Sequence, residues 1–252
     1  MSRLLIFDLD GTLVDSKASI LSSIRFALQE TGYSHLEFNE SLAVQQDLGT
    51  TFRAATERAQ LALDEAKLQI FIETYRKHHS QNPAETMKAY DGIHDLLLRL
   101  HEDFQLAVAT TKHSPQARHI LGQLGLSEYF DHIQGTDPGM RYKPAPDILN
   151  IVLEKLERDP EESLYVGDSP HDMEAAHSAR MMAVGAAYGF AGKESLETAK
   201  PHAWLHSPQD LYGVLEIERI APIRFPLRGR PSARRTRTAW TAAQLAMRSR
   251  GR

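Results

Sequence analysis

Strand-like and helix-like segments alternate along most of this chain, and that order restricts the folds open to it. Short apolar runs occupy residues 4–7, 105–110, 132–135, 163–167 and 181–185. Segments with apolar residues at helical spacing lie between them, at residues 92–100, 115–124, 147–156 and 170–179. Such alternation predicts an α/β fold, a doubly wound parallel sheet covered by helices. A short strand at 204–205 and a helix at 208–219 are expected to close it.

One long stretch departs from the alternation. Between residues 34 and 85 only helix-like segments occur, at 40–48, 52–63 and 65–79, and another is expected at 18–30. We therefore predict an all-helical unit at residues 16–85, inserted into an α/β domain of residues 1–15 and 86–220. Residues 221–252 are rich in Arg, Pro, Ala and Ser, and we expect this tail to be disordered.

Composition and charge exclude several classes of protein. The 252 residues contain no cysteine, which excludes a disulfide scaffold, a thiolate zinc site and a cysteine nucleophile. The chain shows no signal peptide and no run of the ~20 apolar residues that span a bilayer, so we expect a cytoplasmic protein without a membrane partner. Nine tail arginines leave residues 1–220 with 20 basic and 33 acidic residues, a net charge of −13. This acidic body disfavours nucleic acid as a partner, although the tail keeps a polyanion-binding interaction protein open as an alternative.

Two acidic clusters follow predicted strands. Residues 8–12 read Asp-Leu-Asp-Gly-Thr directly after the first strand, and Asp168 and Asp172 follow the strand at 163–167. Carboxylates this close repel one another unless a cation or a shared proton compensates. Mg²⁺ prefers such oxygen ligands, completed by waters and a phosphate oxygen. Because ligands of parallel sheets bind beyond the carboxyl ends of the strands, the clusters predict a Mg²⁺ site there.

Two further strand ends add a hydroxyl and an ammonium. Thr110 ends the strand at 105–110, and Lys143 lies a little beyond the strand at 132–135. A donor and a fixed positive charge are what a phosphoryl group needs near a carboxylate nucleophile. Two Ser-Pro pairs, at Ser114 and Ser169, each predict an N-cap serine with proline in the first helical turn.

In this order, the motifs resemble those of the haloacid-dehalogenase superfamily of phosphohydrolases, in its phosphoglycolate-phosphatase-like branch. The resemblance covers residues 3–215 and rests on DLDGTLVDS at 8–16, TTK at 110–112, KPAPD at 143–147 and GDSPHDMEAA at 167–176. It implies a Rossmann-like doubly wound core with an inserted helical cap that closes over the substrate. It also implies a Mg²⁺-dependent phosphatase for a small phosphorylated metabolite.

The resemblance assigns roles to individual residues. Asp8 would be the nucleophile that forms an aspartyl-phosphate, and Asp10 the general acid and then the general base. Thr110 and Lys143 would hold the phosphoryl oxygens, with Lys143 also offsetting the charge of Asp8. Mg²⁺ would be bound by the Asp8 carboxylate, the Asp10 backbone carbonyl and Asp168.

Other residues would assist this set. Asp172 and Ser169 would support the metal ligands without touching the ion. Gly11, Thr111 and Arg53 are candidate substrate contacts, although the family usually has Asn where this chain has Thr111. Arg53 could bind a substrate carboxylate or a second phosphate.

Several alternatives stay open at this point. A phosphomutase of the β-phosphoglucomutase type would use the same aspartyl-phosphate, and a pyrophosphatase is another outcome in the family. Adjacent histidines point to different sides of a helix, so we expect His78 and His79 at the surface and not at a metal site. The identity of the substrate and the oligomeric state do not follow from the sequence.

Overall fold

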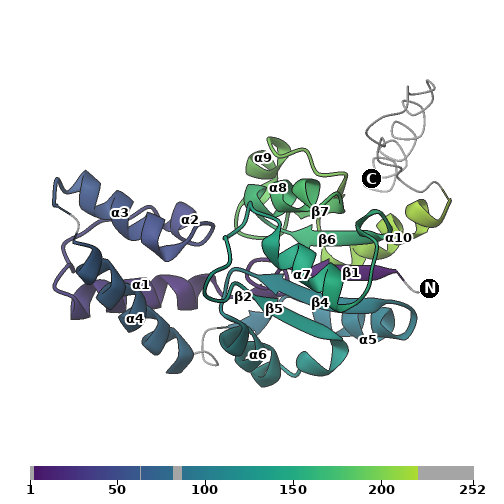
Figure 1. Cartoon of the computed structure of the whole chain (residues 1–252), viewed down its shortest axis with the longest axis horizontal. Helices are drawn as coiled ribbons and strands as arrows, with labels where there is room; N and C mark the ends of the chain where they lie inside the picture. Colours follow the sequence, from purple (N-terminus) through teal and green to yellow (C-terminus); the bar gives the residue numbers. More distant parts are fainter. Residues whose placement is uncertain (1–2, 63, 82–86, 221–252) are drawn as a thin grey trace.

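A six-stranded parallel sheet forms the centre of the protein (Figure 1). The computed structural model describes residues 3–62, 64–81 and 87–220, so the arginine tail at 221–252 lies outside the described residues. The strand order is β5-β4-β1-β6-β7-β8, and every neighbouring pair is parallel. The strands are β1 (Leu4–Phe7), β4 (Gln105–Thr110), β5 (His132–Gly135), β6 (Ser163–Gly167), β7 (Met182–Ala186) and β8 (Ala203–Leu205). The predicted parallel α/β sheet is confirmed.

Helices cover both faces of the sheet, because successive residues of each strand point to opposite sides. Leu5 and Phe7 of β1 belong to a cluster with α5, α6 and α10, whereas Leu4 and Ile6 belong to a second cluster with α7, α8 and α9. These helices are α5 (Ile93–Asp103), α6 (Ser114–Gln123), α7 (Asp147–Lys155), α8 (Pro170–Ser178), α9 (Gly192–Glu197) and α10 (Leu211–Ile220). Because helices pack on both faces of the sheet, the doubly wound arrangement is confirmed. None of the helices in the described ranges combines the length and apolar character needed to cross a membrane.

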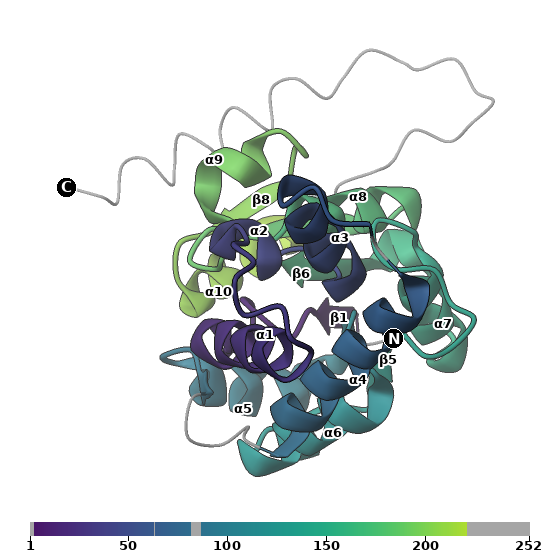
Figure 2. The same cartoon turned by 90° about the vertical axis from the view of Figure 1, so that its left-hand side faces the viewer.

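A separate helical unit stands at the carboxyl edge of the sheet (Figures 1 and 2). It consists of α1 (Lys17–Glu30), α2 (Glu40–Ala43), α3 (Leu48–Arg58) and α4 (Glu65–Gln81). These helices enclose their own hydrophobic cluster, in which the rings of Phe52 and Phe71 stack with centroids 4.4 Å apart. We call this unit the cap; its predicted limits, residues 16–85, stay a prediction, because residues 82–86 lie outside the described part of the chain.

The helix boundaries inside the cap differ from those expected. The segment predicted as one helix at 40–48 ends at Ala43, because Asp47 starts a new helix. The Oδ1 of Asp47 accepts a hydrogen bond from the backbone N–H of Thr50 at 2.9 Å, which caps α3. The helix predicted at 52–63 consequently begins at Leu48, and it ends before Gln60, whose φ of +56° is left-handed.

One of the two predicted serine caps is wrong. Ser169 caps α8 in a reciprocal capping box with Asp172, as expected. Ser114 instead lies inside α6, because its hydroxyl donates to Asp137 Oδ2 at 2.7 Å, and His113 takes the N-cap position.

Several short elements escaped the sequence analysis. Helix α9 and an antiparallel ribbon, in which β2 (Val14–Asp15) pairs with β3 (Lys88–Ala89), were not expected. Single 3₁₀ turns occur at Ser127–Tyr129, Pro160–Glu162 and Pro208–Asp210. The ribbon lies where the chain passes between the sheet and the cap, so it belongs to the connection between them.

We predict that Leu97→Ala destabilises the protein by about 2–5 kcal/mol, because it leaves a cavity in the cluster beneath α5. Leu98, the next residue of the same helix, is 50% exposed and provides the matched control. Leu98→Ala should change the free energy of unfolding by less than about 0.5 kcal/mol. Urea unfolding followed by circular dichroism measures both, and equal effects would contradict the assigned orientation of α5.

Candidate active site

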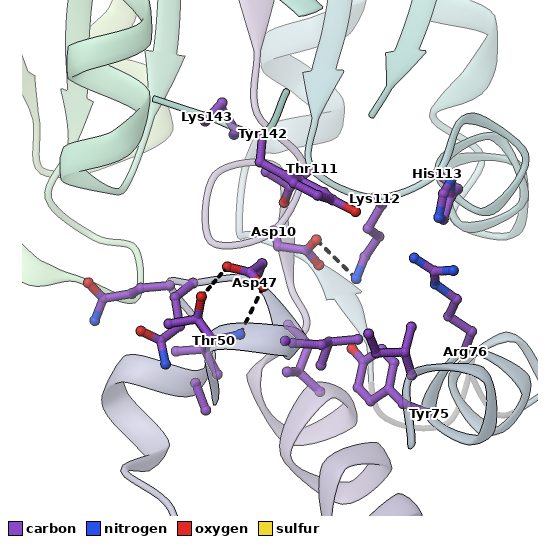
Figure 3. Close-up of a pocket in the computed structure, with 18 of the residues that line it drawn as sticks. Asp10, Asp47, Thr50, Tyr75, Arg76, Thr111, Lys112, His113, Tyr142 and Lys143 are labelled. Atoms are coloured by element: carbon purple, nitrogen blue, oxygen red, sulfur yellow. Dashed lines mark hydrogen bonds and ion pairs between the residues drawn. The ribbon is translucent and has the colours of Figure 1, made fainter. Parts of the chain in front are cut away.

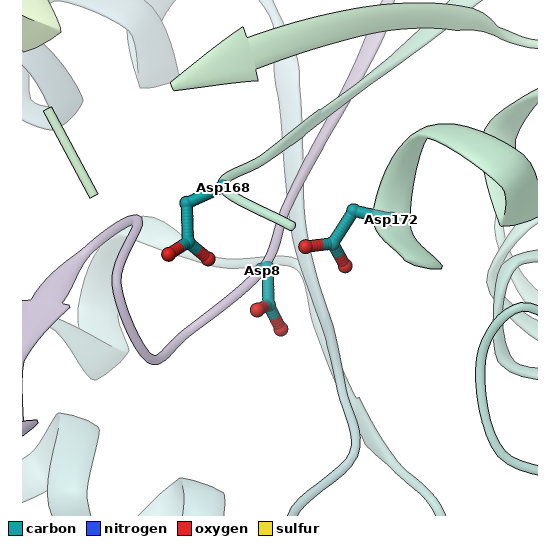
Figure 4. A group of neighbouring side chains, drawn as sticks. All are labelled: Asp8, Asp168 and Asp172. Carbon is teal, nitrogen blue, oxygen red and sulfur yellow. The ribbon is translucent and has the colours of Figure 1, made fainter. Parts of the chain in front are cut away.

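Three aspartates meet where the neighbouring strands β1 and β6 end. Asp8 directly follows β1, Asp168 directly follows β6, and Asp172 lies in the first turn of α8. The parallel register pairs Phe7 with Val166, and the Asp8 N–H donates to the Val166 carbonyl at 2.8 Å, so Asp8 emerges beside Gly167, the residue before Asp168. One oxygen from each carboxylate lies within 4.8 Å of the others, and Figure 4 shows the three side chains gathered at the strand ends. The structure thus brings the two predicted acidic clusters together.

Burial makes this concentration of negative charge costly. Asp8, Asp168 and Asp172 are 7%, 3% and 0% exposed. Burial raises the pKa of Asp8 to about 7 against the opposing charge of Lys143. Burial and the charges of Asp172 and Asp8 also raise the pKa of Asp168 well above its usual range. The described groups therefore leave negative charge uncompensated at Asp8 and Asp168, which is the condition that a bound cation relieves.

Lys143 supplies the positive charge buried beside the aspartates. Its Nζ lies 2.9 Å from Asp8 Oδ1, 2.5 Å from Asp172 Oδ1 and 3.0 Å from the hydroxyl of Tyr165. Although burial alone would lower the pKa of Lys143, the charges of Asp172 and Asp8 raise it above its ordinary value. The ammonium is therefore charged, and it is shared between two carboxylates.

The three carboxylates differ in how many of their oxygens accept hydrogen bonds from the described residues. Asp172 accepts from Ser169 N–H at 2.9 Å and Ser169 Oγ at 2.6 Å through Oδ2, while Lys143 occupies its Oδ1. The Oδ1 of Asp8 is close to Lys143 but not aligned with it as a hydrogen bond, so this buried oxygen has no donor among the described residues. Asp168 accepts from Phe190 N–H at 2.7 Å through Oδ2 alone.

The donor set fits a hard divalent cation such as Mg²⁺. It is made of buried carboxylate oxygens, which Mg²⁺ prefers, and it carries negative charge that Lys143 only partly offsets. Asp8 and Asp168 keep oxygens for an ion, whereas those of Asp172 are already engaged. These contacts support Asp8 and Asp168 as metal ligands and Asp172 and Ser169 as the groups that hold Lys143 and the turn in place.

Glycine is required beside Asp168. Gly11 has a φ of +77°, and a Cβ at this position would lie 2.1 Å from Asp168 Oδ2. A Cβ at Gly189 would lie 2.3 Å from the Cβ of Asp168. Only glycine lets both backbones approach this closely. Gly11 thus leaves room for the carboxylate of Asp168, and the substrate contact expected of Gly11 from the sequence stays a prediction.

Asp10 lies apart from the three clustered aspartates and faces the cap (Figure 3). Its Oδ1 accepts from Ser16 Oγ, and its Oδ2 lies 3.1 Å from Lys112 Nζ. Lys112 Nζ is also 3.0 Å from Nε2 of His79 in α4. Asp10 is therefore connected through Lys112 to the cap.

The protonation of His79 follows from these contacts. An ammonium can only donate, so Nε2 of His79 accepts from Lys112 and the ring proton resides on Nδ1, 3.1 Å from Ser19 Oγ. Burial and the charge of Lys112 lower the pKa of His79 to about 2. The expectation that His79 lies at the surface is wrong: it is 1% exposed, because its face of α4 packs against α1 and Lys112.

A cavity of about 570 Å³ lies between the cap and the strand ends. Asp8, Asp10 and Asp168 line it from the sheet side. The cap contributes residues of α3 and α4 and of the segment before α3, among them Asp47, Thr50, Arg53, Glu65, Tyr75 and Arg76 (Figure 3). A small molecule held there would touch both the aspartates and the cap.

The sequence and the fold of this chain are similar to those of known proteins. Residues 5–186 match the sequence model of the family described as haloacid dehalogenase-like hydrolase. The chain belongs to this family. The predicted membership and enzyme class are confirmed.

Relatives of this hydrolase share nearly their whole length with it. A phosphoglycolate phosphatase from Aquifex aeolicus (strain VF5) is 34% identical, with 85% of this chain and 97% of the relative covered. Pyrophosphatase PpaX from Halalkalibacterium halodurans is 29% identical, with 84% and 96% covered. Among solved structures, a predicted phosphatase from Clostridium acetobutylicum superposes with a TM-score of 0.75 at 29% identity, with 86% and 99% covered.

The remaining predicted site residues of the hydrolase occupy different surroundings. Thr110 is buried at the end of β4, where its Oγ1 accepts from Lys112 N–H at 3.2 Å. Thr111 lines the cavity, whereas Thr110 is not among the described residues that do. Arg53 also lines it, but its guanidinium lies 3.1 Å from both carboxylate oxygens of Glu65. The catalytic and binding roles of all these residues stay predictions.

Several residues of the site were missed by the sequence analysis. Lys112 was quoted only as part of a motif, and Tyr165 only as part of a strand, where its hydroxyl donates to the Ala109 carbonyl at 2.8 Å. Ser16 and Arg76 were not singled out either. Lys112 could have been noticed because it lies two residues after Thr110, the last residue of β4, but nothing local to Arg76 marks its position in the cavity.

We predict that His79 makes the hydrolase sensitive to acid. Its pKa is about 2 in the folded state and ~6.5 in the unfolded chain, so below pH 6.5 the unfolded state binds more protons and stability falls as the pH falls. Lowering the pH from 7 to 5 should cost about 2 kcal/mol through this group.

The comparison of two histidine variants isolates this effect. His79→Gln should lose that part of the pH dependence, whereas replacement of the exposed His119 by Gln should keep it. Urea unfolding at pH 7 and pH 5 measures the free energies. Equal pH dependence in the two variants would show that His79 titrates normally in the folded protein.

Proposed function

We propose that this hydrolase is a Mg²⁺-dependent phosphatase that cleaves a small phosphate monoester through an aspartyl-phosphate on Asp8. The observation that carries the proposal is the meeting of Asp8, Lys143 and Asp168 at one end of the cavity. A nucleophilic carboxylate, a fixed ammonium and a second carboxylate suited to Mg²⁺ are the groups that phosphoryl transfer requires.

The relatives support a phosphorylated substrate and hydrolysis. Those reported above are named phosphoglycolate phosphatase and pyrophosphatase PpaX, which favours transfer to water over the return of phosphate to a sugar. Pyrophosphate is accordingly the second candidate substrate. Phosphoglycolate and pyrophosphate both carry another anionic group beyond the phosphoryl group that is transferred. The non-enzymatic alternative depended on the tail, which lies outside the described residues.

In the proposed first step, a carboxylate oxygen of Asp8 attacks phosphorus, and the bond from phosphorus to the leaving oxygen breaks. Asp10 protonates that oxygen as it departs. Lys143 offsets the negative charge that Asp8 and the phosphoryl group bring together. Ser16 and Lys112 hold the carboxyl group of Asp10 toward the cavity, where the leaving group would lie.

In the second step, water attacks the phosphorus of the aspartyl-phosphate. Asp10, now ionised, accepts the proton of this water, and the bond between phosphorus and the Asp8 oxygen breaks. Inorganic phosphate leaves and the Asp8 carboxylate is regenerated. Mg²⁺, held by Asp8, Asp168 and the backbone carbonyl of Asp10, would supply positive charge to the phosphoryl oxygens.

We predict that Asp8→Asn lowers kcat by at least about 1000-fold, because an amide is a poor nucleophile and cannot form the aspartyl-phosphate. Hydrolysis of p-nitrophenyl phosphate, with Mg²⁺ or with chelator, measures the effect. Asp103→Asn, an exposed change at the end of α5, serves as the matched control and should retain activity. Turnover by Asp8→Asn close to that of the wild type would exclude Asp8 as nucleophile.

We also predict that Gly11→Ala weakens Mg²⁺ binding by about 10- to 100-fold, because the new Cβ displaces Asp168. Gly192→Ala is the control, since Gly192 also has a left-handed φ, +69°, with no atom near its Cβ position. Both variants should lose about 1–2 kcal/mol to backbone strain. The rise in melting temperature with added Mg²⁺ reports binding independently of activity, and equal responses would contradict the role of Gly11.

A further inference from the structure

Arg76 is a cation of the cavity that has no partner among the residues that the structure describes. It lies in α4, is half-buried, and lines the cavity. Figure 3 shows its guanidinium extending from the cap toward His113 at the start of α6. Among the described residues, no hydrogen bond or ion pair from Arg76 is found. A partly desolvated guanidinium left unpaired is costly, which points to a missing anion.

Every other basic side chain of Lys or Arg that lines the cavity is already paired. Lys143 binds Asp8 and Asp172, Lys112 binds Asp10, and Arg53 binds Glu65. The carboxylate of Asp47, which also lines the cavity, caps α3. Among the described carboxylates of the cavity, none forms an ion pair with Arg76.

Two side chains of the α6 region lie in the same part of the cavity. His113 and Gln116 line it together with Arg76, and the same three residues line a neighbouring surface groove. Burial and the positive charge of Arg76 lower the pKa of His113, which confirms that the two groups are close. The buried Nε2 of Gln116 has no acceptor among the described residues. An unsatisfied donor on a residue that lines the same cavity as Arg76 is a second, independent sign of a missing acceptor.

We propose that Arg76 and Gln116 form a subsite for a second anionic group on the leaving part of the substrate. This inference rests on the proposed phosphatase function and narrows its substrate class to monoesters that carry a carboxylate or another phosphate. The guanidinium offers the planar pair of donors that matches either group, and Gln116 adds a third N–H. With phosphorus at Asp8, such a substrate would contact the sheet edge at one end and the cap at the other.

A matched pair of substrates tests the subsite. Ethyl phosphate replaces the carboxylate of phosphoglycolate with a methyl group and leaves the phosphate ester unchanged. The wild-type protein should show a kcat/KM at least about 10-fold higher for phosphoglycolate, because charge-assisted hydrogen bonds discriminate by this much. Arg76→Gln should lower kcat/KM for phosphoglycolate by about 10- to 100-fold and leave that for ethyl phosphate within about 3-fold.

Controls separate charge from fold. Arg58→Gln, an exposed change on α3, should leave both values unchanged. Arg76→Lys keeps the charge but loses the planar donor pair, so it should recover only part of the preference. Pyrophosphate, assayed alongside, distinguishes a phosphate from a carboxylate as the preferred second group. Equal losses on both substrates in Arg76→Gln, or no loss on either, would overturn the subsite.

A binding measurement keeps the subsite distinct from the proposed function. In the Asp8→Asn background, calorimetric titration with phosphoglycolate and Mg²⁺ should show a Kd that rises about 10- to 100-fold on adding Arg76→Gln. If the wild-type protein hydrolyses no phosphate ester, the proposed function fails, and this titration still decides on the subsite. Unchanged affinity in the double variant would reject it.

Discussion

The arrangement of the site depends on one buried ammonium shared by two carboxylates. Lys143 lies between Asp8 and Asp172, while Asp168 lies close to both acids and forms no ion pair with any described residue. Taking ions out of water is expensive unless they are paired, so an ionised Asp168 needs further positive charge beside it, whereas without a cation its raised pKa favours the protonated form. The same imbalance that penalises the protein alone favours the binding of a divalent cation and, beside it, a phosphate.

The excess of buried negative charge follows from local features of the fold. Asp8 and Asp168 follow the neighbouring parallel strands β1 and β6, whose register places Asp8 beside Gly167, the residue before Asp168. The capping box of α8 then turns Asp172 back toward the same point, where it engages Lys143. Gly11 and Gly189 allow their backbones to lie against Asp168. Each of these features is common by itself, and the site forms because they occur together at the carboxyl end of β1 and β6.

The sequence predicted those parts of the structure that depend on local patterns. The buried strand before Asp8 and the cap at Ser169 follow from apolar runs and capping chemistry within a few residues. The N-cap prediction for Ser114 was wrong, because the hydroxyl of Ser114 donates to Asp137, 23 residues further along the chain. The surface position expected for His79 was wrong for a similar reason, since its burial depends on Lys112, 33 residues further along the chain. Contacts across such separations come from packing, which no local pattern encodes.

The site also divides its charges between its two units. The acids with raised pKa values, Asp8 and Asp168, come from the sheet, whereas Arg76, a cation with no ion pair in the described part of the chain, comes from the cap. Lys112 reaches from the sheet side to His79 of the cap while it holds Asp10. Displacement of the cap would separate His79 from Lys112, so the ammonium that contacts Asp10 would lose its second partner. The contacts of Lys112 beside the proposed acid and the proposed recognition of the substrate's far end therefore depend on the same packing of the cap against the sheet.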